Sequence, residues 1–506
     1  MRRYIKKQLV ELQKSLLDMH DVILTLIQHK KFEQAYETIV DFQGALIDVG
    51  SIIDKEEGEG TKAVTCLEQI CEILYTITLE LEKDSVNKYL KKVKNLLFEY
   101  IQHVKYDTKD DKLKMVFFPY KASMWTSFES IWKAASKDEE CDVKVVPIPY
   151  CDLGKGEDSV KWRYEINQYP CDVPVIPFDS YNLEEEMPDI AFIHNPYDAA
   201  NTLTSVHPDY YSSNIKKFAH CLVYSPYYTY GNYTRGKTDD MILTRGAINA
   251  DKIILQSEFT KKIFESYGYA SEKLLAYGSP KADAIVGIGN ERIIPDEWKK
   301  KLEGKKKIFL LNAHWSYFIR GKIYEHEGKF DFAIRYHKEF MQAIGERKEE
   351  CGLIWRPHPL MFSAVETRVP DSMKFLKELE QTIRESDYGV IDNSSDYTKA
   401  FACSDALVST YSSLINEYMI TGKPVMIFQK KPSEEVGKRA PVDYRTCYFK
   451  FLSDGGMSFS EFLDMVLAGE DPKYDERMNM LKSKSFANLD GSAGEKIYKE
   501  LKKIYS

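Results

Sequence analysis

Two neighbouring stretches in the C-terminal third decide the fold: Asp405-Ala-Leu-Val-Ser-Thr-Tyr-Ser-Ser-Leu-Ile-Asn-Glu417 and Gly422-Lys-Pro-Val-Met-Ile-Phe428. The small apolar residues after the aspartate are typical of a buried parallel strand. Ser412 and Ser413 open a helix, Gly422 ends it, and a proline begins the next strand. The pattern predicts a βαβ unit with an anion site at the carboxyl edge of its strands.

A second strand end carries a cation and an imidazole. The segment Trp355-Arg-Pro-His-Pro359 closes a short apolar run, so Arg356 and His358 follow a strand directly. The flanking prolines fix the backbone of His358 and keep it out of a helix, which suits a presented imidazole. Two such edges facing one crevice are expected to hold a diphosphate.

Further short motifs occur in a fixed order around these two edges. Asp392 lies between them, Gly278-Ser-Pro-Lys-Ala-Asp283 precedes them, and Asp490-Gly-Ser-Ala493 follows them. In this order the motifs resemble the CDP-glycerol glycerophosphotransferase family, which includes teichoic acid polymerases and primases. The resemblance covers roughly residues 113 to 500, and each motif alone is weak evidence.

The resemblance implies an α/β fold with two Rossmann-like domains in a GT-B-like arrangement, preceded here by an all-α N-terminal domain. It implies a transferase that moves glycerol phosphate from CDP-glycerol to a hydroxyl of a cell-wall or capsular glycan or polyol acceptor, with release of CMP. The partners would be this nucleotide-diphosphate donor and a glycan or polyol-phosphate acceptor, lipid-linked or not. No cofactor and no metal are expected.

The resemblance also distributes roles among the donor-side residues. Phosphoryl transfer without an evident metal motif requires fixed donors for the negative charge. His358 and Arg356 are expected at the diphosphate. The expected ligands of the leaving phosphate and of the nucleoside or polyol hydroxyls are Ser412, Ser413, Asp392, Glu417 and Arg320.

The general base that accepts the proton of the acceptor hydroxyl is not decided by the sequence. The candidates are His194, Asp198 and His314, which all follow predicted strands. The buried-polar alternative for His194 also stays open. This chain lacks the family's Trp-His-Gly-Thr-Pro segment near the acceptor. It has His314 where the family has threonine, and Thr410 where the family more often has aspartate.

Three other functions remain compatible with these residues. The same crevice would serve a nucleotide-sugar glycosyltransferase, or a transferase of ribitol phosphate from CDP-ribitol. A non-catalytic nucleotide-binding scaffold is the alternative outside enzymes.

Composition excludes several classes. A net charge of −8 and a pI near 5.8 argue against non-specific nucleic-acid binding. The 9 cysteines form no CxxC pair or zinc-like cluster, which is typical of reduced thiols. With no signal peptide and no membrane-length apolar run, a cytoplasmic protein is expected, with contact at most peripheral to the inner face of the cell membrane.

At 506 residues the chain is long enough for several domains. We predict a helical domain at 1–108, an acceptor-side Rossmann-like domain at 109–290, a donor-side one at 291–470 and a helical tail at 471–506. A helix is expected over 123–135.

The predicted helical domain repeats apolar residues at helical spacing, which indicates a four-helix bundle. It is predicted to mediate homo-oligomers or partner docking. A membrane-surface role is the alternative, because the domain is basic at Arg2, Arg3, Lys6, Lys7 and Lys88–Lys94.

Overall fold

The computed structural model describes residues 1–153, 162–200, 204–231, 239–289, 291–318, 329–358, 361–394, 396–428, 440–450 and 456–505. The chain divides into two compact units. The first comprises 1–114, 138–142 and 500–506, and the second comprises 115–137 and 143–499.

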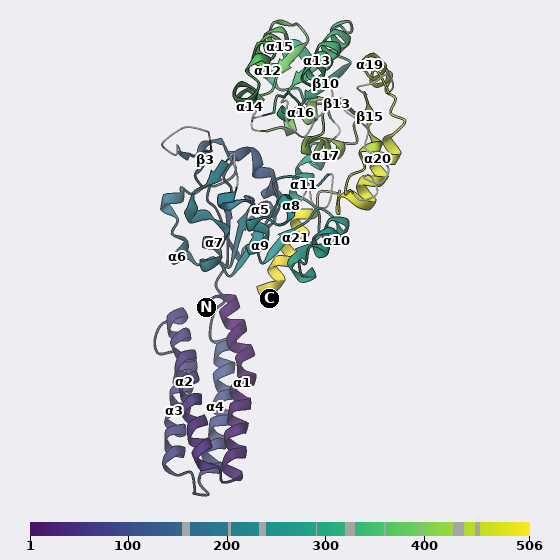
Figure 1. Ribbon diagram of the computed structural model, residues 1–506. Coiled ribbons are helices and arrows are strands. Elements are labelled where there is room, and N and C mark those ends of the chain that lie inside the picture. Colours follow the sequence, from purple (N-terminus) through teal and green to yellow (C-terminus); the bar gives the residue numbers. More distant parts are fainter. Residues whose placement is uncertain are drawn as a thin grey trace. The chain divides into compact units, whose positions relative to one another are not determined.

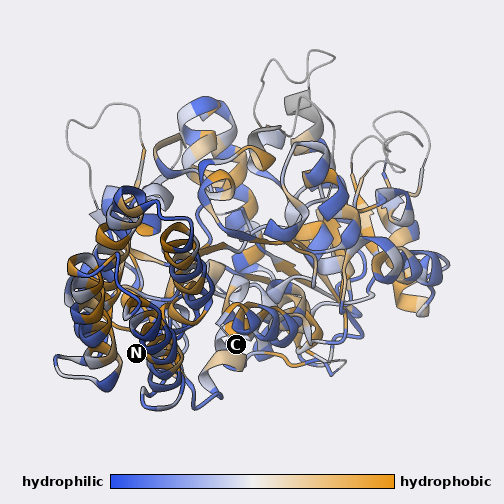
Figure 2. Ribbon diagram, turned by 90° about the horizontal axis from the view of Figure 1, so that it is seen from below, coloured by the Kyte–Doolittle hydropathy of each residue, from blue (hydrophilic) through white to orange (hydrophobic). Residues whose placement is uncertain are grey.

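The first unit contains an antiparallel four-helix bundle (Figure 1). Hydrophobic and hydrophilic residues lie on different faces of these helices (Figure 2), and the apolar faces bury residues such as Ile23, Phe42 and Tyr100, each at 0% exposure. No helix in the described part of the chain is both long and apolar enough to cross a bilayer. The helices are α1 (Arg3–Gln28), α2 (Phe32–Glu57), α3 (Lys62–Leu79) and α4 (Val86–Tyr106).

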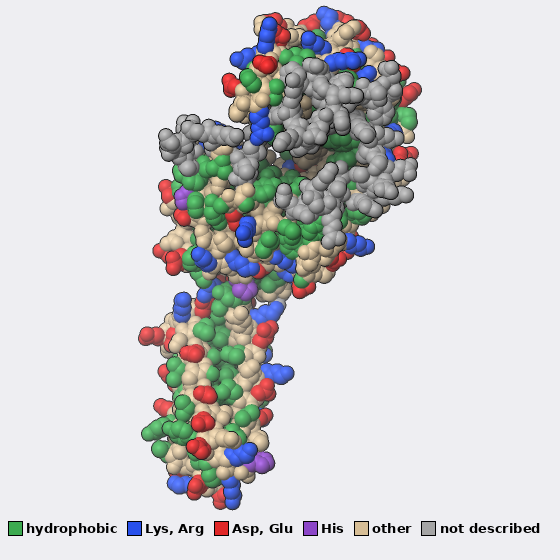
Figure 3. Space-filling model, viewed as in Figure 1, with side chains coloured by type: hydrophobic (Ala, Val, Ile, Leu, Met, Phe, Trp, Pro, Cys, Tyr) green, Lys and Arg blue, Asp and Glu red, His purple; other side chains and the backbone are tan. Residues whose placement is uncertain are grey.

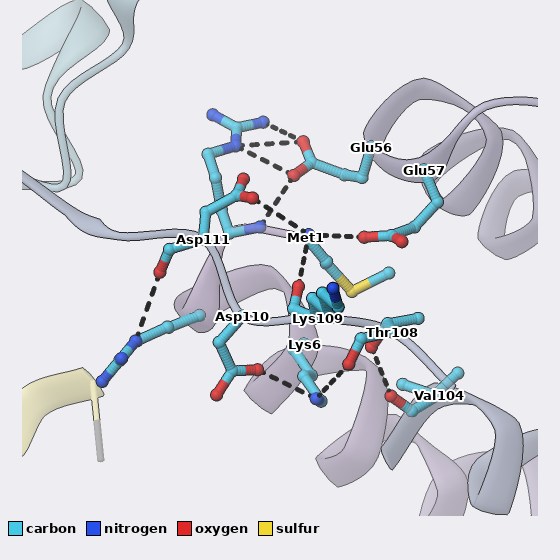
Figure 4. A network of polar contacts seen from close by, with 11 residues as sticks. Met1, Lys6, Glu56, Glu57, Val104, Thr108, Lys109, Asp110 and Asp111 are labelled. Atoms are coloured by element: carbon cyan, nitrogen blue, oxygen red, sulfur yellow. Dashed lines mark hydrogen bonds and ion pairs between the residues drawn. The ribbon is translucent and has the colours of Figure 1, made fainter. Parts of the chain in front are cut away.

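Most of the basic residues at the start of α1 are paired within this unit. Arg2 forms an ion pair with Glu56, and Lys6 contacts Asp110 at 2.9 Å (Figure 4). Arg3 contacts Glu140 at 3.4 Å. Since these cations are neutralised internally, the start of the chain offers less charge to an anionic surface than its sequence suggests.

The second unit contains two six-stranded sheets, except for residues 113–114 and 141–142 of the first sheet, which belong to the first unit. The first has the order β2-β1-β5-β7-β8-β9, which is 2-1-3-4-5-6 when its strands are counted along the chain. Neighbouring strands from β1 through β9 are parallel, and their residues are almost all buried, as expected for a sheet covered on both faces. Its strands are β1 (Leu113–Phe118), β2 (Cys141–Val145), β5 (Ile190–Ile193), β7 (Cys221–Tyr224), β8 (Lys252–Ile254) and β9 (Leu274–Leu275).

Short helices connect the strands of the first sheet. The helix expected over 123–135 is instead a 3-10 turn, Ala122–Ser127, followed by α5 (Glu129–Ser136), because the backbone at Phe128 leaves the helical region. The others are α6 (Leu183–Glu186), α7 (Ser212–Phe218), α8 (Asp239–Ile242), α9 (Arg245–Asn249) and α10 (Glu258–Ser266). A small antiparallel sheet of β3 (Tyr150–Asp152), β4 (Trp162–Arg163) and β6 (Thr204–Val206) was not predicted.

The second sheet is parallel and has the order β12-β11-β10-β13-β14-β15, which is 3-2-1-4-5-6 along the chain. This is the order of a dinucleotide-binding Rossmann sheet. Two Rossmann-like sheets in succession make the second unit GT-B-like, as predicted. The strands are β10 (Lys307–Asn312), β11 (Cys351–Trp355), β12 (Gly389–Ile391), β13 (Ala406–Ser409), β14 (Val425–Ile427) and β15 (Tyr448–Phe449).

Helices around the second sheet bury two apolar layers. One layer gathers Phe309, Trp355 and Phe428, and the other gathers Leu310, Phe401 and Tyr418. The helices are α12 (Asp296–Leu302), α13 (Lys329–Gly345), α14 (Met361–Arg368), α15 (Met373–Glu385), α16 (Thr398–Cys403), α17 (Ser413–Met419), α19 (Phe459–Ala468) and α20 (Tyr474–Met480).

Two of the motifs noted in the sequence meet where α11 (Pro280–Val286) faces the start of α21 (Ala493–Lys502). The Asp283 carboxylate accepts the backbone N–H of Ala493 at 3.1 Å and of Gly494 at 2.7 Å. Gly278 has a φ of +107°, and a Cβ there would lie 2.5 Å from the Ala487 carbonyl oxygen. Gly278 and Asp283 of the first motif thus allow the segment that contains the second motif, 490–493, to pack against α11.

Candidate functional site

The candidate site lies at the carboxyl edge of the second sheet. His314 follows β10, Arg356 and His358 follow β11, Asp392 follows β12, and Ser412 follows β13. Ligands of open parallel sheets bind at this edge, near the point where the strand order reverses. The strand order reverses beside β10, so the two histidines lie next to the reversal.

His314 and His358 are in direct contact. Their ring centroids lie 4.8 Å apart at an interplanar angle of 66°. Burial lowers the pKa of His314 to about 4, and burial together with the neighbouring His314 lowers the pKa of His358 to about 3. Both imidazoles are therefore neutral at pH 7.

The surroundings of His314 determine its tautomer. Its Nδ1 accepts the backbone N–H of Ser316 at 3.3 Å and lies 2.6 Å from the Ser316 hydroxyl. Because a backbone N–H only donates, the ring proton is on Nε2. The backbone N–H of His314 donates to Thr410 Oγ1 at 2.9 Å. The threonine that replaces the family's aspartate thus ties the loop after β10 to the loop after β13.

Arg356 and Asp392 form an ion pair and are 12% and 1% exposed, respectively. Arg356 also donates to the Ser394 carbonyl at 2.9 Å, and Asp392 accepts the Ser394 N–H at 3.0 Å. Both residues were predicted at the donor. The structure brings them together, and this arrangement holds the guanidinium in one orientation at the sheet edge.

Ser412 precedes α17 and Ser413 is its first residue, as predicted. The Ser412 hydroxyl oxygen is inaccessible and has no hydrogen-bond partner among the described residues, whereas Ser413 is exposed. Ser412 follows β13, the strand that pairs with β10 on the side opposite β11, so it lies at the same edge of the sheet as Arg356 and the two histidines.

Glu417 forms a buried ion pair that was not predicted from the sequence. Its carboxylate lies 2.9 Å from Lys281 Nζ, and the two side chains are 3% and 8% exposed. Lys281, on α11, also donates to the Tyr227 carbonyl at 2.8 Å. Glu417 therefore neutralises a buried lysine, and its contact with donor hydroxyls stays a prediction. The sequence offered one signal for Lys281: its position inside the Gly278–Asp283 motif.

His194 is fully buried within the first sheet's layer. The Tyr120 backbone N–H donates to its Nε2 at 3.1 Å, so its Nδ1 carries the proton and donates to Ser127 Oγ at 3.1 Å. Burial, with a smaller effect of the Lys281 charge, lowers the pKa of His194 to about 3. Both ring nitrogens are thus used inside the protein, which matches the buried-polar alternative.

Asp198 is also turned inward. Its carboxylate accepts the backbone N–H of Ser212 at 2.9 Å and the Ser212 hydroxyl at 2.5 Å. Burial raises the pKa of Asp198. Through these hydrogen bonds Asp198 holds the first residue of α7, and its own backbone has a φ of +47°. Arg320, the remaining predicted residue, lies outside the described residues.

The low pKa of His194 predicts that acid destabilises the fold. A histidine with a pKa near 3 in the folded protein binds fewer protons below pH 6.5 than the same histidine in the unfolded chain. The contribution of His194 to the free energy of unfolding is therefore fully present above pH 6.5 and is lost as the pH falls. The loss from this residue should reach about 2 kcal/mol at pH 5. Thermal unfolding midpoints at pH 7 and pH 5 check this. The difference should be smaller in His194→Asn, and an equal difference would contradict the prediction.

A model of the CDP-glycerol:poly(glycerophosphate) glycerophosphotransferase family matches residues 228–503, more than half of the chain. The chain belongs to this family. The matched range contains the contacting pair His314 and His358 as well as Arg356 and Ser412, whereas His194 and the helical bundle precede it.

Among the relatives of this glycerophosphotransferase-family chain is a teichoic acid poly(ribitol-phosphate) polymerase of Bacillus spizizenii. The two are 23% identical over 260 residues, which cover 50% of this chain and 37% of the polymerase. The chain thus matches little more than a third of that relative's length. The wall teichoic acid polymerase TagF aligns with a TM-score of 0.49 at 14% identity, over 87% of this chain and 98% of that one. A UDP-N-acetylglucosamine 2-epimerase aligns with a TM-score of 0.49 at 15% identity, over 78% and 97%.

Proposed function

We propose that this chain transfers glycerol phosphate from CDP-glycerol to a hydroxyl of a cell-wall or capsular glycan or polyol acceptor, releasing CMP. Membership in the glycerophosphotransferase family supports the reaction class. The observation that carries the proposal is the pair of neutral imidazoles at the sheet edge that also holds Arg356. Such a group offers both a proton acceptor and a cation to a reacting diphosphate.

In the proposed reaction, the acceptor hydroxyl oxygen attacks the phosphorus that bears glycerol. The bond between this phosphorus and the CMP oxygen breaks, and CMP leaves with the bonding electron pair. The acceptor proton passes to an imidazole. One P–O bond forms for the one that breaks, so negative charge is concentrated on the leaving phosphate and on the two non-bridging oxygens of the transferred phosphate.

The hydrogen bonds around the histidines suggest separate roles. His314 carries its proton on Nε2 and suits hydrogen-bond donation to a phosphate oxygen. We therefore assign the base to His358. The negative charge of a bound diphosphate will raise its pKa from the low value set by burial, toward the range of an effective base. Arg356, oriented by Asp392, and the Ser412 hydroxyl would meet the leaving phosphate, with Ser413 at the rim.

His194 and Asp198 receive positioning roles in this proposal. Each uses its polar atoms within the first Rossmann-like layer, His194 on Tyr120 and Ser127, and Asp198 on Ser212. Glu417 supports the fold through Lys281. Changes at these three residues would act through stability or geometry.

The test is release of CMP from CDP-glycerol, CDP-ribitol and a panel of UDP- and GDP-sugars, without added acceptor and with wall-polymer acceptors. We expect CMP from CDP-glycerol, even as slow background hydrolysis. Preference for CDP-ribitol would support the ribitol alternative, in keeping with the name of the Bacillus relative. Release of UDP or GDP from a sugar would overturn the proposal, and nucleotide binding without turnover of any donor would favour the scaffold.

We further propose that the protein works at the inner face of the cell membrane, where a nucleotide donor and a lipid-linked acceptor meet. Exposed lysines near the start of α4 leave room for a peripheral contact, although most basic residues of α1 are paired.

Tyr36, Val40 and Ile47 are 47–62% exposed on α2, and hydrophobic side chains are visible on the bundle surface in Figure 3. They support the predicted homo-oligomer, which sedimentation velocity can check.

A further inference from the structure

Two opposite corners of the helical bundle expose faces of opposite charge. The neighbouring helices are α1 and α2, α2 and α3, α3 and α4, and α4 and α1, so α2 and α4 lie at opposite corners. Both helices are long, with 26 residues in α2 and 21 in α4, which gives outer faces of about 39 and about 32 Å. Each outer face can therefore receive a helix of another molecule while the other face stays accessible.

The outer face of α2 combines apolar and acidic side chains. Tyr36, Val40 and Ile47 are 47–62% exposed, and their spacing places them on one line along the helix. The exposed carboxylates on the same outer face are those of Glu33, Glu37, Asp41 and Asp48. Among the described residues no cation forms an ion pair with any of these four carboxylates. The face therefore offers apolar contact area and unpaired negative charge together.

Gly44 lies on the same line of α2, between Val40 and Ile47. It is exposed, and a Cβ at this position would meet no atom within 4 Å. Glycine inside a helix is less favourable than alanine, and the packing of the bundle does not require it here. A glycine on an outer face does allow the backbone of a second helix to approach closely. Gly44 is thus explained by a helix that docks from outside.

The outer face of α4 carries the opposite charge. Phe98 and Tyr106 are 47% and 76% exposed. The exposed charged side chains around them are one carboxylate, Glu99, and the ammonium groups of Lys88, Lys91, Lys92 and Lys105. Lys94 pairs with Asp21 of α1 at 3.3 Å, whereas these four lysines have no carboxylate partner among the described residues. This face therefore complements the face of α2 in charge and shares its exposed apolar groups.

We propose that the acidic outer face of α2 docks on the basic outer face of α4 of a second copy of this chain. Charge complementarity selects this occupant, because α2 against α2 would bring two acidic faces together, and α4 against α4 two basic ones. The contact is heterologous, since the two surfaces differ, so successive copies can form a ring or a chain. It gives the proposed homo-oligomer, on which it rests, a defined interface, and it is independent of the transfer reaction.

The test reverses the charge of one face at a time in the full chain. The α2 variant carries Glu37→Lys, Asp41→Lys and Asp48→Lys. The α4 variant carries Lys88→Glu, Lys91→Glu and Lys92→Glu. A third variant combines all six changes. Because these side chains are exposed and have no ion-pair partners in the described bundle, every variant should fold.

Self-association is measured by sedimentation velocity over a range of protein concentrations, at low and at high salt. We expect the unchanged protein to associate, and to do so more weakly in high salt because the ions screen the charges. The α2 variant and the α4 variant should each associate at least about tenfold more weakly. The combined variant should associate again, and so should a mixture of the α2 variant with the α4 variant, since opposite charges then face each other.

Two further variants separate docking from folding. The matched control reverses the same number of exposed carboxylates away from both faces, on α1 and α3, by Glu11→Lys, Asp18→Lys and Glu68→Lys. Its association should stay within a few-fold of that of the unchanged protein. Gly44→Gln should keep or raise the free energy of unfolding, because glutamine favours helix, but its side chain should hold the docking helix away and weaken association.

A protein that is monomeric at all concentrations would overturn the proposal, as would association that survives both single-face reversals or the Gly44→Gln change. Failure of both the combined variant and the mixture to associate would also overturn it. A monomer that binds phosphatidylserine–phosphatidylcholine vesicles through the α4 lysines would assign that face to the membrane instead. CMP release from CDP-glycerol without acceptor should persist in every variant. Its absence from the unchanged protein would refute the proposed reaction and leave the assembly result standing.

Discussion

Replacing His358 with alanine is expected to lower CMP release from CDP-glycerol by about two to four orders of magnitude, the usual contribution of a general base. The imidazole is neutral because burial lowers its pKa to about 3, and it contacts His314 at the edge where Arg356 is held. The measurement is the initial rate of CMP release in single-donor assays with matched folded protein.

His337 provides the matched control for this experiment. It lies on α13 in the same Rossmann-like layer, is 1% exposed, and has a pKa lowered by burial to about 4, but its Nδ1 pairs with the Ala333 carbonyl at 2.6 Å. His337→Ala should lower stability while leaving the rate per folded molecule within a few-fold of the unchanged protein. Equal rate losses in both variants would assign the His358 effect to folding and remove its role as base.

Lys281→Met is expected to lower the free energy of unfolding by about 3–5 kcal/mol, because it leaves the Glu417 carboxylate buried without its cation. The pair lies 2.9 Å apart with both side chains under 10% exposed. It joins α11, which follows the first sheet, to α17, which belongs to the second. Denaturant unfolding monitored by tryptophan fluorescence measures the loss.

A double-mutant cycle separates the ion pair from simple packing. Lys281→Met combined with Glu417→Gln removes both charges and should recover much of the stability lost in the single variants. Strict additivity of the two losses would show that the charges do not interact, and the proposed structural role of Glu417 would fail. Lys374→Met provides a comparison at the surface. Lys374 and Glu378 are both exposed and form an ion pair with an N–O distance of 3.9 Å, so this change should alter the free energy of unfolding by less than about 1 kcal/mol.

Local patterns in the sequence were enough to predict the main strands and the helices of the bundle. Buried apolar runs such as 406–409 and 307–311 are strands because small or branched residues fill both faces of a parallel sheet. The bundle followed from apolar residues at helical spacing. The small antiparallel sheet of β3, β4 and β6 escaped prediction because its strands are two or three residues long and lie in loops.

The donor side of the site was also accessible from the sequence, since residues after parallel strands must gather at one edge. This rule collects His314, Arg356, His358 and Asp392 without any knowledge of their contacts. The rule does not predict which way each side chain points or which partner it contacts. Asp392 turns to Arg356, and Glu417 turns to a lysine more than a hundred residues away.

The sequence by itself thus determined the two Rossmann-like layers, the helical bundle and the sheet edge where the chemistry is proposed. Only the tertiary structure decided which polar side chains are buried against one another: His194 on Tyr120 and Ser127, Asp198 on Ser212, and Glu417 on Lys281. The reason is physical. A strand or helix is specified by neighbours in the chain, whereas a buried charge or imidazole must find whichever distant partner offsets its desolvation.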